Sequence, residues 1–481
     1  MNTHCKSSKL ELQGPERRIL TADFDGGHLT SDAGVLLLKQ LDQKLSILKR
    51  FSECFVDARD PGRVEHSVEE LLRQRVFALA LGYEDLNDHD QLRLDPLLAT
   101  AVGKADALGN ERKRARHHGA ALGSRSTLNR LEFALKAEAA EGRYCRVSAD
   151  RDAIENLFVD LFLDSFEEAP EQIVLDFDHT DNPLHGHQEG RFFSGYYREY
   201  CYLPLYVFCG RHLLCAKLRP TSTGTQEESL EVLEYLVERI RERWNKVEIV
   251  FRADGYFSSE PLMTWCESND VDYVIGYRRN PRVQRELEDV FVEMEAEREK
   301  EIADADGAVA TQESVRRFKS FQYRTLKSWA RDRRMIGKAE LTPKGRNPRF
   351  VVTSLDDSHD SRMIYEEIYC ARGECENRIK EQQLDLFSTR TSGHLIHVNQ
   401  MRLWFSGLAY VLIDTLREKI LRDTDLADAR CETIRLKLFK VAAKVRVTVR
   451  RVWISMASSY PWQDRYRDIW KRLEKLEPCT V

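Results

Sequence analysis

The chain has 481 residues, of which 42% are hydrophobic and 32% are charged, and its net charge is −5. This balance is typical of a globular chain with roughly two to four domains and excludes a disordered one. No apolar run reaches the roughly 18 residues of a membrane span, the first residues lack the apolar core of a signal peptide, and the 11 cysteines are scattered. The sequence therefore predicts a cytoplasmic protein with reduced thiols and no membrane partner.

Residues 1–150 are predicted to form a mostly helical, DNA-binding region. Ser67 and Glu70 have the spacing of a capping box that opens a helix. A cationic loop over 111–119 then leads into a second helix near Ser126. Arg125 and Arg130 lie near the start of that helix and are candidate DNA contacts. A solvated loop before a packing helix explains the same composition equally well.

Residues 151–280 are predicted to form the first part of an α/β core. A buried strand within 173–183 (IVLDFDHTDNP) is followed by strands at 201–209 and 212–220, a helix at 225–244 and a strand at 248–255. A short helix and a strand at 272–278 complete the series. Three strands, helix, strand, helix, strand is the order of an RNase-H-like fold, which has a mixed sheet with helices on its faces.

Residues 281–347 are predicted to be a basic, β-rich insertion into this core. From 316 to 350 the sequence has 12 cations and 2 acids, a net charge of 12 − 2 = +10, with aromatic residues interleaved. Cations for phosphates and ring faces for unstacked bases suit a nucleic-acid clamp. The candidate DNA-binding residues here are Arg324, Lys327, Trp329, Arg333 and Arg334. The alternative is a solvated charge run, with Trp329 in the core.

Residues 348–425 are predicted to complete the core, and they contain a helix over 362–383. Five of its side chains fall at steps of three and four and share one face: Tyr369, Arg372, Glu376, Lys380 and Gln383. A carboxylate beside a guanidinium and a phenol suits a metal ion next to a DNA phosphate. A solvated helix face with a Glu376–Lys380 ion pair remains the alternative.

The last segment, 426–481, is predicted to be a basic C-terminal tail. It has seven cations and no acid from Arg435 to Arg451, and its end alternates like a strand. The tail is either a second DNA contact or an edge strand protected by charge.

Four acids are candidates for one site. Asp176 and Asp178 share a face of the first strand, Asp254 ends the fourth, and Glu376 lies on the later helix. The first and fourth strands of an RNase-H-like sheet are neighbours. Clustered carboxylates repel unless divalent cations neutralise them, so we expect two Mg²⁺ or Mn²⁺ ions, roughly 4 Å apart, that act in phosphodiester cleavage. Each acid alone could equally be a turn or cap residue.

Three motifs, DFDHTDNPLHG, FRADGYF and YCARGECENRIK, resemble in order and spacing the acid motifs of Asp-Asp-Glu (DDE) insertion-sequence transposases. The flanking segments LTSDAGVLLL, SRSTLNRLE, GYYREYCYLPLYVF and HVNQMRLW are similar to the group typified by the insertion sequence numbered thirteen-eighty, distant kin of the piggyBac elements. The resemblance implies an RNase-H-like core with a β-rich insertion. It also implies a nucleoid-associated bacterial enzyme that cuts and transfers strands at terminal inverted repeats, joins them to target DNA and works as a homodimer.

By motif match, Asp178 is the first acid, Asp254 the second and Glu376 the third, with Asp176 and Asp181 as competitors for the first position. Tyr369 and Arg372 match the residues that precede the third acid in these transposases. Gln383 replaces the lysine that ends the motif, and Lys380, one turn earlier, is a candidate substitute. In related transposases a tryptophan of the insertion stacks on a flipped base, and Trp329 is the candidate for that role.

Two other functions remain open. LDFDHT also fits the nucleophile loop of haloacid-dehalogenase-type phosphatases, with Asp176 as nucleophile, Asp178 as acid/base and Asp356–Asp357 as a later metal pair. The second is a catalytically inactive, DNA-binding relative of the transposases.

Overall fold

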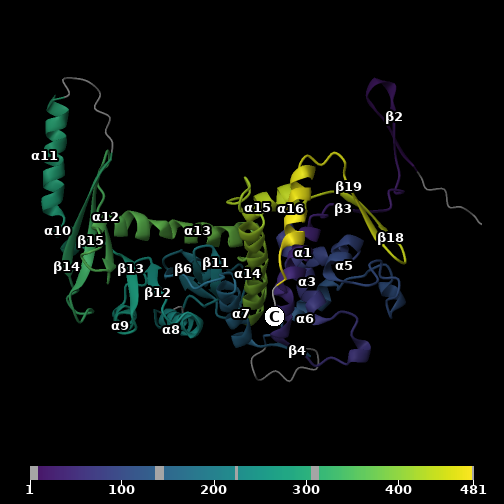
Figure 1. Cartoon of the computed structure of the whole chain (residues 1–481), viewed down its shortest axis with the longest axis horizontal. Coiled ribbons are helices and arrows are strands. Elements are labelled where there is room, and N and C mark those ends of the chain that lie inside the picture. The colour runs from purple at the N-terminus through teal and green to yellow at the C-terminus, as the bar shows by residue number, and fades with distance from the viewer. Residues whose placement is uncertain (1–8, 136–145, 223–225, 305–313, 479–481) are drawn as a thin grey trace, which may run out of the picture. The chain divides into compact units, whose positions relative to one another are not determined.

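The computed structural model describes residues 9–135, 146–222, 226–304 and 314–478 (Figure 1). The chain forms two compact units, Met1–Ser148 with Leu408–Val481, and Ala149–Gly407. The division falls within the long helix α14 (Ile396–Lys419). In the part of the chain that the structure describes, no helix is long and apolar enough to cross a membrane.

The unit formed by 149–407 is built on a nine-stranded mixed sheet with the order β11-β10-β6-β12-β13-β17-β15-β14 and with β16 paired to β15. β12 runs parallel to β6 and to β13, whereas β10, β11, β17, β15 and β14 pair with their neighbours in antiparallel fashion. The strands are β6 (Gln172–His179), β10 (Leu205–Cys209), β11 (His212–Lys217), β12 (Glu248–Ala253), β13 (Val271–Tyr277), β14 (Val315–Tyr323), β15 (Arg333–Thr342), β16 (Gly345–Arg346) and β17 (Arg349–Thr353). A small sheet of β7 (Asn182–Pro183), β9 (Glu199–Tyr202) and β8 (Phe192–Ser194) lies apart from it.

Helices cover both faces of this sheet. The helices of the unit are α7 (Arg151–Leu163), α8 (Gln226–Arg243), α9 (Glu260–Ser268), α10 (Pro281–Arg285), α11 (Glu288–Asp304), α12 (Ser361–Met363) and α13 (Gly373–Lys380). Figure 1 shows α8 and α9 on one side of β6, β12 and β13, and the segment with α12 and α13 on the other.

The alternation of each strand decides which residues meet which helices. Ile249 and Phe251 of β12 pack in a large core with α7, α8 and α9, whereas Val250 packs in a smaller core with Ile364 and Tyr365 of the opposite helical segment. Because side chains alternate along a strand, Arg252 and the position after β12 belong to the second face. The acids of β6 at even positions share it. The sequence therefore directs its candidate acids toward the helical segment.

The predicted helix over 362–383 is a continuous helical segment from Ser361 to Asp385 with irregular winding. Between α12 and α13 it contains a π-helical stretch, Ile364–Tyr369, and a 3₁₀ turn, Cys370–Arg372, and it ends in a second π-helical stretch, Glu381–Asp385. π-helical turns are rare and occur often at functional sites.

The segment 281–347 differs from the predicted β-rich insertion. It begins with two helices, α10 and α11, and its hairpin of β14 and β15 continues the central sheet beyond β17. The strand predicted over 201–209 is also two strands, β9 and β10, interrupted at Leu203–Pro204. Proline lacks the amide hydrogen that a ladder requires, which explains the break.

The other unit is mostly helical. Its helices are α1 (Val35–Leu45), α2 (Ile47–Glu53), α3 (Val68–Leu81), α4 (His89–Leu92), α5 (Pro96–Val102), α6 (Arg125–Glu132), α15 (Cys431–Ile434) and α16 (Gln463–Lys475). Its strands are β1 (Leu10–Gln13), β2 (Ile19–Ala22), β3 (His28–Thr30), β4 (Phe55–Asp57), β18 (Ala443–Val447) and β19 (Val452–Met456), and β5 (Val147–Ala149) lies at the division. The Ser67–Glu70 capping box of α3 is confirmed.

Candidate active site

Asp178 and Asp254 lie at the adjacent ends of two parallel strands. The prediction that the first and fourth strands are neighbours is confirmed, because β6 pairs with β12 in a register that places Phe177 opposite Ala253. Asp178 follows Phe177 and Asp254 follows Ala253, so the two acids are the next residues along the two strands. Each carboxylate accepts a local backbone hydrogen bond at 2.9 Å, Asp178 from the amide of His179 and Asp254 from the amide of Tyr256.

Arg372 joins the first acid to the third. Its Nη1 donates to Asp178 Oδ2 at 3.1 Å, and its Nη2 donates to Glu376 Oε1 at 2.5 Å. The side chains of Arg372 and Asp178 are 18% and 13% exposed, whereas that of Glu376 is 41% exposed. The predicted helix face thus contacts the sheet through Arg372. Glu376 forms its ion pair with Arg372 and not with Lys380.

The pKa of Asp178 responds to both other acids. Burial is the largest cause that raises this pKa, Arg372 lowers it, and the charges of Asp254 and Glu376 raise it, so that it comes to about 7. A carboxylate with these neighbours gains from any additional cation. The geometry therefore brings together the acids of all three sequence motifs.

Asp176, the competitor for the first position, has a different partner. Arg252 of β12 lies directly across from it and binds both carboxylate oxygens, with Nε–Oδ1 at 2.5 Å and Nη2–Oδ2 at 2.6 Å. Arg252 also donates to the carbonyl of Ile368 at 2.6 Å. Since both oxygens of this buried acid are occupied by a guanidinium, the prediction of Asp176 as a metal ligand does not agree with the structure.

The fit of a metal ion depends on Arg372. Within the described residues, no group of three or more His, Cys, Asp or Glu side chains is close enough to hold one. The donor set of Asp178, Asp254 and Glu376 consists of hard carboxylate oxygens, which suit Mg²⁺ or Mn²⁺. In the structure, the positive charge between two of these acids is the guanidinium of Arg372. The chemistry of these donors fits a divalent cation, whereas their arrangement in the structure fits the guanidinium of Arg372.

The remaining residues of the helical face lie in three different surroundings. Tyr369 packs against β13, where a Cβ added to Gly276 would lie 2.5 Å from its hydroxyl. Gln383 donates to Thr180 Oγ1 at 3.1 Å and to the carbonyl of Asp181 at 3.3 Å, so it ties the helical segment to the end of β6. Lys380 is exposed.

A pocket of about 960 Å³ opens beside Asp254. Aromatic and cationic side chains dominate its lining, among them Tyr256, Tyr277, Arg278, Arg349 and Tyr369. Tyr256, Tyr277, Arg278 and Arg349 are not among the predicted site residues. The signal that could have found three of them is their position, because Tyr256 follows β12 and Tyr277 and Arg278 lie at the end of β13.

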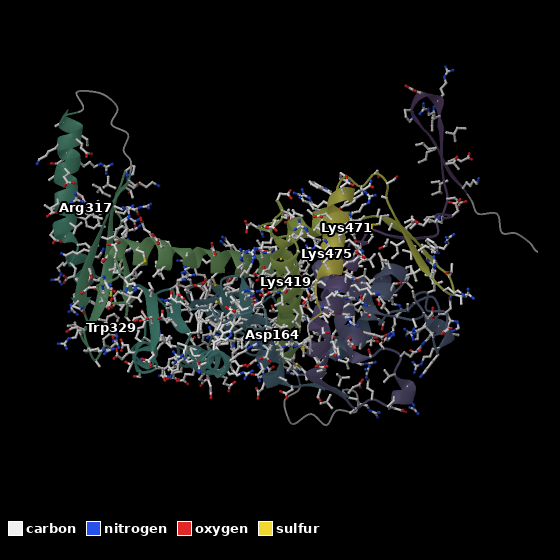
Figure 2. The ribbon with its side chains drawn as sticks, in the orientation of Figure 1. Asp164, Arg317, Trp329, Lys419, Lys471 and Lys475 are labelled. Atoms are coloured by element: carbon white, nitrogen blue, oxygen red, sulfur yellow. The ribbon has the colours of Figure 1, made fainter. Side chains whose placement is uncertain are left out.

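Three predicted DNA-binding residues of 316–349 are structural. Trp329 is 6% exposed and packs edge-on against Tyr277, with ring centroids 5.3 Å apart (Figure 2). The buried Arg333 pairs with two glutamates of α9, with its Nε 2.8 Å from Glu267 Oε1. The buried Arg334 donates to the carbonyl of Leu355 at 3.0 Å and to neighbouring carbonyls. These placements correct the prediction, because none of the three side chains is available to DNA.

Most of the positive charge in this stretch is neutralised within the protein. Nine of the twelve cations form ion pairs: Arg316, Arg317, Lys319, Arg324, Arg331, Arg333, Arg334, Lys338 and Arg346. Several partners are acids of α11, and Arg317 faces that helix in Figure 2. Arg324 is exposed and 3.7 Å from Asp332, and Lys327 is exposed.

The two N-terminal candidates lie on α6 of the other unit. Arg125 donates to Asn87 Oδ1 at 2.8 Å, pairs with Asp90 at 3.2 Å and keeps 59% of its side chain exposed. Arg130 is exposed. Their role in DNA binding stays a prediction.

The match to one protein-family model agrees with the motifs. The family model described as transposase DDE domain, group 1, matches residues 13–478. No curated protein matches the sequence. Among solved structures, the chain is similar to a piggyBac transposase determined by cryo-EM as a synaptic complex with hairpin DNA. The identity is 12%, the match covers 94% of this chain and 86% of that chain, and the TM-score is 0.40.

Proposed function

Because the chain belongs to the transposase DDE domain group 1 family, we propose that it cleaves and transfers DNA strands with Asp178, Asp254 and Glu376 as its catalytic acids. The observation that carries the assignment is the convergence of these acids from three separate segments. The raised pKa of Asp178, to which both other acids contribute, records that convergence. The strand order β11-β10-β6-β12-β13 supports an RNase-H-like core.

The three carboxylates would hold Mg²⁺ or Mn²⁺, which supplies Lewis-acid stabilisation and an activated oxygen nucleophile when bound. Arg372 provides a planar fork with two donors, and this geometry matches two oxygens of a phosphate as well as it matches carboxylates. Its role is to hold the DNA phosphate next to the acids. Tyr369, packed on Gly276 beside the pocket, supports the same helical face.

The natural substrate that we propose is double-stranded DNA that carries the terminal inverted repeats of a bacterial insertion sequence, together with target DNA. The motif matches support the group of the insertion sequence numbered thirteen-eighty, and such an enzyme would act as a homodimer at the nucleoid. The retention of all three acids supports an active enzyme over an inactive DNA-binding relative.

The phosphatase alternative requires Asp176 as a free nucleophile. The bidentate ion pair with Arg252 occupies both of its oxygens, and Asp356 and Asp357 are exposed, with Asp357 paired to Arg334. The family match and this geometry both disfavour that reading.

The test is cleavage of a labelled duplex that carries the terminal repeat of the source element, with Mg²⁺ or Mn²⁺ and with EDTA. We expect metal-dependent nicking at the repeat boundary that Asp178→Asn, Asp254→Asn and Glu376→Gln each abolish. The matched control is Glu374→Gln, an exposed acid on the same helical segment. Binding without any cut in the wild type would favour the inactive relative, and cleavage by the Glu376 variant would remove that residue from the site.

A further inference from the structure

The C-terminal basic stretch has no role in the site described above. Its last part forms a hairpin, here called the basic ribbon, that consists of β18, β19 and the tip 448–451 (Figure 1). The ribbon belongs to a three-stranded sheet of the order β19-β18-β3, so β19 is an edge strand. The tip is closed by hydrogen bonds between Thr448 and Arg451, at 2.8 Å from amide to carbonyl and 3.1 Å from amide to hydroxyl.

The two faces of the ribbon differ. Ala443 and Val445 are buried, whereas Lys444 and Arg446 between and beyond them are exposed. Arg446 lies opposite Trp453 and Lys444 lies opposite Ser455 on β19. One face of β18 therefore packs within its unit, and the other presents cations to solvent.

Six of the seven cations of the basic stretch separate into two groups, and the seventh, Lys437, lies 4.9 Å from the ring centroid of Trp462. Arg435 donates to the carbonyl of Ala80 at 2.8 Å, and Lys440 pairs with Asp32 at 2.7 Å, so both serve the fold. The ribbon carries four others, namely Lys444, Arg446, Arg450 and Arg451. Among the described residues, no carboxylate forms an ion pair with any of these four. They contrast with the β14–β15 hairpin, whose cations are largely matched by the acids of α11 and its surroundings.

Aromatic packing stiffens this face. The guanidinium groups of Arg446 and Arg451 each lie 5.6 Å from the ring centroid of Trp453. Trp453 itself is 46% exposed. Val449 at the tip is fully exposed. Charged side chains on an edge strand protect it against pairing, but the edge strand β19 carries none of the four cations, which lie on β18 and at the tip. Such protection does not account for three arginines, an exposed tryptophan and an exposed apolar tip.

We propose that the basic ribbon is a docking surface for duplex DNA. Arginine forks and a lysine present unpaired donors to phosphates. A two-stranded β-ribbon also has the dimensions to enter the major groove, with the tip as the leading edge. The proposal rests on the proposed function in taking DNA as the partner, but it assigns duplex binding to a surface separate from the three acids.

The experiment measures binding of the full chain to fluorescently labelled duplexes by anisotropy, over a series of salt concentrations, with the terminal repeat and with an unrelated sequence. The test variant replaces the four ribbon cations with glutamine. Each lost phosphate contact lowers the slope of log K against log salt by about 0.9, so we expect the slope to fall by about 3 to 4 on both duplexes. Affinity near 0.1 M salt should fall at least tenfold.

Two further variants separate charge from structure. Replacing the three ribbon arginines with lysine keeps the charge and should keep the slope within about one. A second control removes four cations from the segment β14–β16 by changing Arg317, Lys319, Lys344 and Arg346 to glutamine. This variant should also leave the slope nearly unchanged. Circular dichroism melts check that each variant is folded.

The possible failures are distinct. If the wild type binds DNA and the four-glutamine variant shows the same slope, the ribbon proposal is overturned and the proposed function stands. If the slope falls equally in the lysine variant, charge is not the cause and the proposal is again overturned. If the wild type binds neither duplex, both proposals are overturned.

Discussion

Asp176 and Asp178 are two residues apart on one strand face, yet their surroundings predict opposite effects on stability. We consider Asp176→Asn and Asp178→Asn, which preserve side-chain size and remove one charge each. Asp176 is 1% exposed and binds Arg252 through both oxygens. Loss of its charge leaves a buried guanidinium without a counter-ion. Breaking a buried ion pair from one side costs about 3–5 kcal/mol, so we expect Asp176→Asn to destabilise the protein by that amount.

Asp178 responds in the other direction. Its pKa rises from 3.8 to about 7 in the folded protein, with burial as the largest cause. The folded state therefore retains a proton that the unfolded state loses near pH 4, and the stability from this group is lost as pH rises from about 4 to about 7. A pKa that is about 3 higher in the folded protein corresponds to about 4 kcal/mol, and this value already includes the opposing effect of Arg372. Asp178→Asn should therefore stabilise the metal-free protein above pH 7.

The assay is urea denaturation of the full chain in EDTA, followed by fluorescence and circular dichroism, at pH 5 and pH 8. The two variants should differ in the sign of the change at pH 8, and the gain from Asp178→Asn should shrink at pH 5. A double variant, Asp176→Leu with Arg252→Met, should recover part of the loss, because an apolar pair replaces the ion pair. Equal destabilisation by both asparagine variants would refute the division of roles.

Three more predictions follow from the same structure. Trp329→Ala should cost about 3–5 kcal/mol in urea denaturation because it empties a core site, and DNA anisotropy should show no selective loss of binding in the folded variant. Arg372→Gln should strengthen Mn²⁺ binding in the absence of DNA by about tenfold (about 1.4 kcal/mol) in calorimetry, since the guanidinium competes for the acids. Arg362→Gln on the same segment is the control, and an unchanged affinity in Arg372→Gln would contradict the competition. Burial lowers the pKa of His89 to about 3, so protons favour the unfolded chain between pH 6.5 and 3. This histidine should remove about 1.4 kcal/mol of stability per pH unit in that window, and His89→Gln should flatten the dependence in urea denaturation at pH 7, 6 and 5.

The order of elements was predictable from local patterns. Continuous apolar runs and amphipathic periods are properties of short segments, and β6, α8, β12, α9 and β13 lie close to their expected places. Their order predicts that β6 and β12 are neighbours and therefore that Asp178 and Asp254 lie side by side. The prediction of Glu376 as the third acid came from its place on the helix over 362–383 and from the motif around it.

The sequence does not predict which side chains on different helices and strands contact one another. The choice between Asp176 and Asp178 depends on the register that places Arg252 opposite Asp176, which is a property of strand pairing. The high local charge of 316–350 could not be interpreted alone, because α11 supplies its neutralising acids only after the hairpin folds beside it. Trp329 is similar, since its partner Tyr277 lies on another strand.

The direction in which the third acid, Glu376, points depends on the winding of the π-helical stretch Ile364–Tyr369. A π-helical turn contains one residue more than an α-helical turn, and one residue corresponds to about 100° of rotation. If this stretch rewound as a regular α-helix with its full number of residues, the side chains after it would turn by about 100° and Glu376 would face away from Asp178. Deleting a single codon in this stretch removes the extra residue of the wider turn, so we expect Glu376 to keep its direction and the chain to keep its cleavage activity. A sequence alignment that places a one-residue gap here incorrectly would assign the third acid to Cys375 or Asn377.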